Sequence, residues 1–180
     1  MSGSRSEAVR AYVRWMIRVD MPAVLNIERG SFESPWSEED FLACLRQRNC
    51  IGMVAEVPTG IPGMETVAGF MVYELHKAKI DVLNLAVHPD FRKRRIGMEM
   101  VAKLQSKLAD HRRTRITAMV RETNLPAQKF FLACGLRATK VVRGHYPDTV
   151  EDAYRFVYRM PVEASVEVVG GSADELEGMQ

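Results

Sequence analysis

A cationic segment between an apolar run and a helical pattern holds the residues of this chain that are best suited to chemistry. Residues 82–87 form the apolar run, Pro89 ends it, and four consecutive basic residues follow before Gly97. Because a helix N-terminus presents unpaired N–H groups and the positive end of its dipole, this order favours an anion site. A pyrophosphate fits it, with donors expected from Arg92, Lys93, Arg94, Arg95, Ile96, Gly97 and Met98.

The patterns around this segment predict one mixed sheet flanked by helices. Alternating or continuous apolar runs predict strands at residues 12–19, 51–57, 66–75, 80–87, 115–120, 136–142 and 152–160. Helices are expected after an Asp20 N-cap, after a Ser37/Asp40 capping box, after Gly97, and over residues 124–134, where Gly135 ends the last one. The order is α+β in character, a three-layer arrangement of about seven mostly antiparallel strands and about four helices.

Composition places the chain among ordinary globular proteins. It has 180 residues, 47% hydrophobic and 27% charged, with a formal net charge of +2. No apolar run reaches the roughly 18 residues that span a bilayer, so no membrane association is expected. Cys44, Cys50 and Cys134 lack metal-ligand spacing and suit reduced thiols of a cytoplasmic protein, with no metal. The near-neutral balance argues against direct nucleic-acid binding, although the basic run alone allows a solvated surface or an RNA contact.

The cationic segment resembles the acetyl-coenzyme A signature of GNAT acetyltransferases, Q/R-x-x-G-x-G/A. Arg92 takes its first position, Arg95 stands in the first glycine place, and Gly97 is the second glycine. The resemblance extends over residues 13–160 and is closest to RimI-type enzymes, which acetylate the N-terminal alanine of a ribosomal protein. It rests on four further segments, F-E-S-P-W-S-E-E at 32–39, V-R-E-T-N-L-P-A at 120–127, F-F-L-A-C-G-L at 130–136 and H-Y-P with E-D-A at 145–153.

This resemblance implies a GNAT fold with acetyl-CoA as co-substrate. It implies that pantetheine pairs with the backbone of Leu85, Ala86 and Val87, and that the Val87 N–H stabilises the oxyanion. Asn124 would reach the pantetheine or the thiol, although it suits a helix N-cap equally. Arg95 in a glycine place is expected to have negative φ, with its side chain toward solvent or a 3′-phosphate.

Two positions depart from the RimI-type pattern. Met119 stands where those enzymes have a glutamate base, and Phe131 where they have a tyrosine acid. General acid–base assistance is typically worth roughly a hundred- to ten-thousand-fold. The loss favours an N-terminal α-amine, about a quarter to a third neutral at cytosolic pH, over lysine, only about a thousandth neutral. Tyr146, or a water near Glu33, is the replacement to test, although Tyr146 also suits a packed tyrosine.

The sequence therefore predicts an acetyl-CoA-dependent N-acetyltransferase acting by direct attack on the thioester. The expected acceptor is a protein or peptide N-terminus, a ribosomal protein among the candidates, in a groove lined by Glu33, Trp36, His145 and Tyr146. Glu33 or Asp152 would meet the cationic amine. The alternatives are acetylation of a small amine, or a CoA-binding module without turnover. We expect a monomer or homodimer, a disordered or tag-like segment at residues 1–12, and a mobile acidic tail at residues 161–180.

Overall fold

The computed structural model describes residues 10–110 and 112–161 as a seven-stranded sheet with helices on both faces. The order of strands in the sheet is β1-β2-β3-β4-β5-β7-β6, and only the β4–β5 pair is parallel. The strands are β1 (Tyr12–Trp15), β2 (Cys50–Pro58), β3 (Glu65–Leu75), β4 (Lys79–Val87), β5 (Arg115–Arg121), β6 (Arg137–Tyr146) and β7 (Glu151–Arg159). The helices are α1 (Met21–Arg29), α2 (Glu38–Leu45), α3 (Ile96–Asp110) and α4 (Leu125–Ala133), with short 3-10 turns at Arg18–Asp20 and Pro89–Phe91. This confirms the predicted order and fold class.

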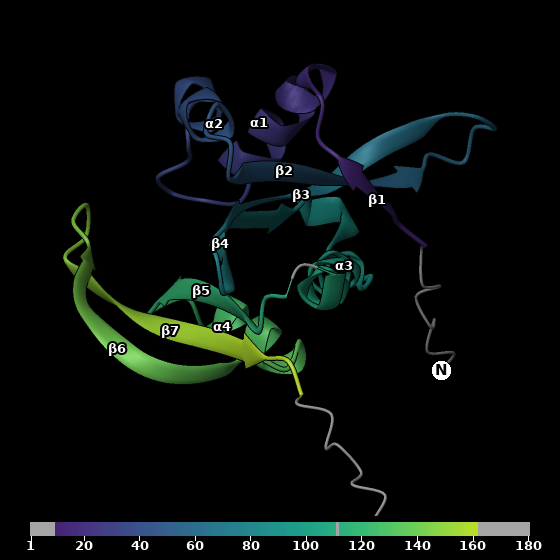
Figure 1. The fold of residues 1–180 in the computed structure, drawn as a ribbon. Coiled ribbons are helices and arrows are strands. Elements are labelled where there is room, and N and C mark those ends of the chain that lie inside the picture. Colours follow the sequence, from purple (N-terminus) through teal and green to yellow (C-terminus); the bar gives the residue numbers. More distant parts are fainter. Residues whose placement is uncertain (1–9, 111, 162–180) are drawn as a thin grey trace, which may run out of the picture.

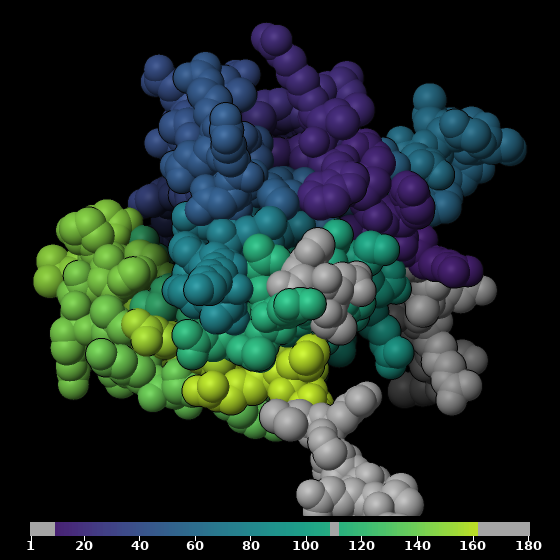
Figure 2. Space-filling view, viewed as in Figure 1, coloured from purple at the N-terminus to yellow at the C-terminus, as the bar shows by residue number. Residues whose placement is uncertain are grey.

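Two apolar cores lie on opposite faces of the sheet because successive strand residues point to opposite sides. On β2, Met53 packs in the core under α3 and α4, while Val54 packs in the core under α1 and α2. Figure 1 shows α1 and α2 above β2 and β3, with α3 and α4 on the other side. In the space-filling view the N-terminal residues form the upper layer and the C-terminal strands the lower one (Figure 2).

The N-terminal part of the chain differs from the sequence prediction. β1 ends at Trp15 rather than at Val19. The Asp20 carboxylate does not cap α1 but accepts hydrogen bonds from the Arg14 guanidinium and the Ile17 N–H, all at 2.8 Å. These bonds turn residues 17–20 out of the sheet. Tyr12, assigned to the N-terminal segment, already pairs with Glu56; residues 1–9 and the tail from residue 162 lie outside the described residues.

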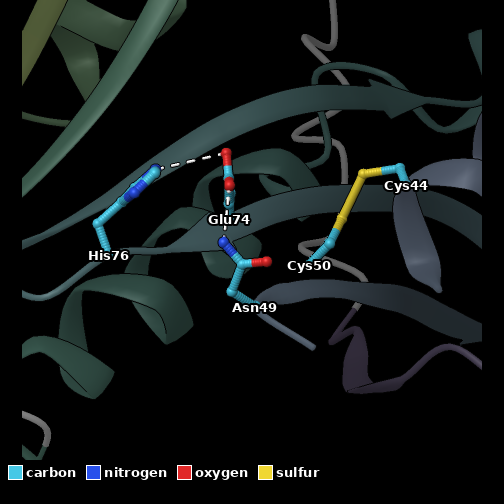
Figure 3. The surroundings of a disulfide bond; sticks show 5 residues. All are labelled: Cys44, Asn49, Cys50, Glu74 and His76. Atoms are coloured by element: carbon cyan, nitrogen blue, oxygen red, sulfur yellow. Dashed lines mark hydrogen bonds and ion pairs between the residues drawn. A yellow bond between two sulfur atoms is a disulfide. The ribbon is translucent and has the colours of Figure 1, made fainter. Parts of the chain in front are cut away.

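The cysteines are a second difference. Cys44 at the end of α2 and Cys50 at the start of β2 form a disulfide with Cα atoms 6.1 Å apart (Figure 3). Thus, the prediction of reduced thiols was wrong for this pair, and the cysteines no longer support a cytoplasmic location. Cys134 is a half-buried free thiol, and burial raises its pKa to about 11. Within the described ranges no helix is both long and apolar enough to cross a bilayer.

Candidate functional site

A cavity opens where β4 and β5 separate. The two strands pair only from Lys79 with Arg115 to Val82 with Ala118, and beyond that point neither is bonded to the other. The gap leads into a cavity of about 200 Å³. It is lined by the ends of β4 and β5, the chain around α1 and α2, α4 and the end of β6, with Glu28, Trp36, Asn84, Leu85, Met119, Arg121, Asn124, Phe131 and Tyr146 among its residues.

The end of β4 directs part of its backbone toward this gap. The His88 N–H donates to Ala68 at 2.8 Å, and β3 pairs Phe70 with Ala86. Because hydrogen-bonding directions alternate along an antiparallel pair, the backbone groups of Leu85 and Val87 face away from β3, whereas those of Ala86 face β3. The structure thus brings Leu85 and Val87 to the open side. Ala86 is buried among the residues under α1 and α2.

The cationic loop leaves six consecutive N–H groups without a partner. The Arg92 N–H donates to Pro89, and the first helical bond runs from the Glu99 N–H to Arg95. Between them, no N–H from Lys93 to Met98 donates to any residue in the described part of the chain. A helix N-terminus with this many unpaired donors can bind an anion.

Two residues of this loop adopt left-handed backbone conformations. Lys93 has φ 61° and Arg95 has φ 67°. The expectation of negative φ at Arg95 was therefore wrong: the arginine keeps the backbone shape that glycine favours. Arg92 holds the loop in place, because its guanidinium donates to the Val87 carbonyl at 3.0 Å and to the Ser31 hydroxyl at 2.9 Å.

Gly97 is required by close packing rather than by its φ. A Cβ atom at this position would lie 3.0 Å from Cε2 of Phe130 and 3.5 Å from Cγ2 of Val87. α3 can therefore approach α4 and the end of β4 only with glycine here. Asn124 caps α4 through its side-chain oxygen, which accepts from the Ala127 N–H at 3.1 Å, and it also lines the cavity.

Tyr146 crosses the gap from the end of β6. Its hydroxyl donates to the Met119 carbonyl at 3.2 Å, and the Arg121 guanidinium lies 3.9 Å from its ring centroid. Burial raises the pKa of Tyr146, against the opposing charge of Arg121, and the nearby carboxylates raise it further. The phenol therefore stays protonated at neutral pH and can donate a hydrogen bond.

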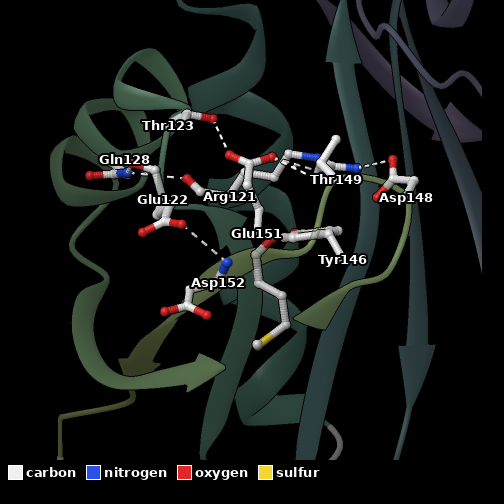
Figure 4. Close-up of polar contacts among 10 residues, drawn as sticks. Arg121, Glu122, Thr123, Gln128, Tyr146, Asp148, Thr149, Glu151 and Asp152 are labelled. Atoms are coloured by element: carbon white, nitrogen blue, oxygen red, sulfur yellow. Dashed lines mark hydrogen bonds and ion pairs between the residues drawn. The ribbon is translucent and has the colours of Figure 1, made fainter. Parts of the chain in front are cut away.

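Arg121 fastens the loop that carries Tyr146. It donates to Asp148 at 2.7 Å, to Glu151 at 2.9 Å and to Thr149 at 2.6 Å (Figure 4). The hydrogen bonds from Arg121 lower the pKa of Asp148, and those from Thr123 and Arg121 lower the pKa of Glu151. The β6–β7 loop is thereby held against β5.

Glu28 is a site residue that sequence reasoning missed. Its side chain is 1% exposed at the cavity, and it accepts from the Trp36 N–H at 2.8 Å and from the Asn84 amide at 3.1 and 3.2 Å. Burial raises the pKa of this carboxyl, and the two donors oppose the shift. A carboxyl with a shifted pKa in a cleft is a candidate functional group. The available signal was a charge on the apolar face of α1, next to Ile27 and four residues after Val24.

The other expected groove residues divide into two groups. Trp36 and Tyr146 line the cavity, as do the apolar Met119 and Phe131. Glu33 is exposed and lies outside it, and His145 lines a separate groove on the open face of the sheet. Asp152 instead accepts from Arg143 and from the Gly144 N–H.

In residues 10–110 and 112–161, no three His, Cys, Asp or Glu side chains gather as metal ligands.

Comparison with known proteins gives one consistent result. Residues 21–136 match the profile of the acetyltransferase (GNAT) family. A [ribosomal protein bS18]-alanine N-acetyltransferase of Salmonella typhimurium is 23% identical over 144 residues, 79% of this chain and 92% of that protein.

Solved structures show the same fold. The ribosomal-protein-S18-alanine N-acetyltransferase of Escherichia coli superposes with a TM-score of 0.72 at 21% identity, covering 86% of this chain and 98% of that one. NAA60 of Arabidopsis thaliana, crystallised with acetyl-CoA, gives 0.71 at 18% identity over 84% of this chain and all of that one.

Proposed function

The chain belongs to the acetyltransferase (GNAT) family, and from this premise we propose that it transfers the acetyl group of acetyl-CoA to the N-terminal α-amine of a protein or peptide. The observation that carries the proposal is the run of six unpaired N–H groups from Lys93 to Met98, next to the strands that separate. Ribosomal proteins are among the acceptors to test, because the similar enzymes of Salmonella and Escherichia coli are named for that substrate.

The residues present fit acetyl-CoA. The unpaired N–H groups at the start of α3 suit a diphosphate, with Lys93, Arg94 and Arg95 supplying positive charge. The open backbone groups of Leu85 and the open N–H of Val87 suit the amides of the pantetheine arm, and Asn124 lies at the cavity end of that path. When bound, acetyl-CoA supplies a thioester whose carbonyl carbon accepts the amine and whose sulfur departs. The Val87 N–H is the proposed donor to the carbonyl oxygen.

The acceptor amine is proposed to enter from the side of Trp36 and Tyr146. Glu28 acts as a positioning residue: it holds Trp36 and Asn84, and its negative charge favours an α-ammonium group at the cavity. As the C–N bond forms and the C–S bond breaks, Tyr146 is the proposed hydrogen-bond donor to the departing sulfur once its O–H turns away from the Met119 carbonyl, and the proton that the amine loses passes to water. An α-amine with a pKa near 7.8 is already about a quarter neutral at physiological pH, so it needs less help from a base than a lysine does.

The proposal is tested with short peptides that begin with Ala, Ser or Met. Mass spectrometry after incubation with acetyl-CoA should detect one added acetyl group on the α-amine. The same peptides with a blocked N-terminus and a free lysine are the matched control and should stay unmodified. Tyr146→Phe should lower kcat by about tenfold or more with acetyl-CoA affinity unchanged.

Binding of acetyl-CoA is measured separately by calorimetry. If the protein binds acetyl-CoA but modifies none of these peptides, while a polyamine is acetylated, the acceptor is a small amine and the proposal is wrong.

A further inference from the structure

In residues 10–110 and 112–161, no helix covers the part of the α1/α2 face that is formed by β5, β7 and β6. α1 and α2 cover β2, β3 and the end of β4 but do not extend over β5, β7 and β6 (Figure 1). On β5, Ile116, Ala118 and Val120 pack under α3 and α4, so Arg115, Thr117 and Met119 face the other way. A groove of about 540 Å³ lies over this uncovered face.

The groove is strongly basic. Lys79, Arg115, Arg155 and Arg159 line it, and its single carboxylate is Asp81. Asp81 is already engaged by Lys79 at 2.5 Å and by His76 at 3.1 Å. Across the described ranges, none of the three arginines forms an ion pair.

Two of these arginines oppose each other across the ladder. Arg115 on β5 is the direct partner of Arg159 on β7. Like charges in directly opposite positions destabilise a sheet. An anionic group over the two arginines relieves their electrostatic repulsion. The charge pattern therefore favours an acidic ligand.

The groove adjoins the acceptor cavity. Met119 and Val82 line both of them. From Met119 the groove follows β5 back to Arg115, four residues or about 13 Å along the strand. An extended peptide whose N-terminus lies in the cavity would therefore cover the groove with its following residues, from about the third to about the seventh.

We propose that this groove binds acidic side chains of the acceptor polypeptide downstream of its N-terminal residue, which makes the enzyme selective for acceptors with an acidic N-terminal segment. The inference rests on the proposed function, because it assumes a peptide amine in the cavity. A peptide is favoured over a nucleic acid because none of the described residues that line the groove is a Phe, Trp or Tyr on which a base could stack.

The test compares three peptides with the same two N-terminal residues. Positions three to seven carry Asp and Glu in the first peptide, the corresponding amides in the second, and Lys in the third. We expect kcat/KM for the acidic peptide to exceed that for the amide peptide by about tenfold at low ionic strength, mainly through KM, and the advantage to shrink in about 1 M salt.

Variants locate the effect. Arg155→Gln and Arg159→Gln should each reduce the acidic advantage by about threefold, and Arg159→Gln should also raise thermal stability because it removes the repulsion with Arg115. Lys103→Gln, on the exposed side of α3, removes the same charge elsewhere and should leave the advantage intact.

The possible results separate the two proposals. Equal rates for the acidic and amide peptides, or a preference for the lysine peptide, overturn the groove inference and leave the proposed function standing. Absence of product from all three peptides, with acetyl-CoA bound, overturns both. If the preference appears only after Glu163, Glu167, Asp174, Glu175 and Glu177 are replaced by amides, the chain's own segment is the ligand and the acceptor inference is wrong. RNA binding that Arg155→Gln abolishes, without peptide selectivity, assigns the groove to nucleic acid and also overturns it.

Discussion

Replacing Gly97 by alanine should weaken acetyl-CoA binding by about tenfold while the protein stays folded. The new Cβ would stand 3.0 Å from Cε2 and 3.2 Å from Cζ of Phe130, so the start of α3 must move by about 0.4 Å to reach the ordinary contact limit of 3.4 Å. That movement carries the N–H groups of Ile96, Gly97 and Met98, which are the proposed diphosphate donors.

The expected magnitude follows from two opposing effects on the fold and one on binding. Overpacking costs about 1–3 kcal/mol, and alanine regains up to about 1 kcal/mol of helix propensity, so the net loss of stability is about 0–3 kcal/mol. A hydrogen bond to a charged group contributes about 1.5–3 kcal/mol. Losing the equivalent of one such bond should raise the Kd of acetyl-CoA by about tenfold.

Calorimetric titration with acetyl-CoA and thermal denaturation measure the two effects separately. Phe130→Leu removes the ring that the new methyl group contacts, and it serves as the matched background. Gly97→Ala in that background should bind acetyl-CoA to within about twofold of Phe130→Leu alone. Unchanged affinity in the single Gly97→Ala variant, or no recovery in the double variant, would refute the packing argument.

Two further predictions concern Glu28 and Arg95. Burial raises the pKa of Glu28 in the folded protein. The stabilising contribution of this carboxyl is therefore complete below its pKa in the unfolded chain and is lost as the pH rises through its pKa in the folded protein. Glu28→Gln should therefore stabilise the fold more at pH 7 than near pH ~4. Urea denaturation at both pH values measures this, and an equal effect at each contradicts it. Arg95→Gly should raise the free energy of unfolding by up to about 1 kcal/mol because it relieves the φ of 67°. Arg94→Gly, where φ is not positive and the guanidinium contacts the Phe91 ring, should lower it, and chemical denaturation of both variants decides.

The elements that local patterns specify were predictable. The Ser37 hydroxyl accepts from the Asp40 N–H and the Asp40 carboxylate accepts from the Ser37 N–H, as the capping box predicts. Gly135 ends α4 with φ 85°, the left-handed geometry expected of a C′ glycine. The central strands β2, β3, β4 and β5 were predicted to within a residue or two of their ends because each has at least one apolar face. These features depend on neighbours in sequence, so the sequence carries them directly.

The features that were missed depend on contacts that only the folded chain makes. Glu28 reads as an ordinary helical glutamate until Asn84, 56 residues later, meets it across the cavity. The sequence predicts Asp20 as an N-cap because nothing in the pattern indicates that its carboxylate accepts a hydrogen bond from Arg14 instead. The basic groove joins residues from four strands, and only the order β4-β5-β7-β6 brings Lys79, Arg115 and Arg159 together. The disulfide between Cys44 and Cys50 was missed because it depends on the path of the chain from α2 into β2, which brings the two thiols together.

The Arg92 side chain gives the molecule a direct mechanical link between its two binding regions. One guanidinium spans the Val87 carbonyl at the end of β4 and the Ser31 hydroxyl in the segment that leads to Trp36. A shift of the turn proposed to bind the diphosphate would therefore displace the segment proposed to receive the amine. Thermodynamic linkage makes this coupling reciprocal. If bound acetyl-CoA raises the affinity for the peptide by some factor, bound peptide raises the affinity for acetyl-CoA by the same factor.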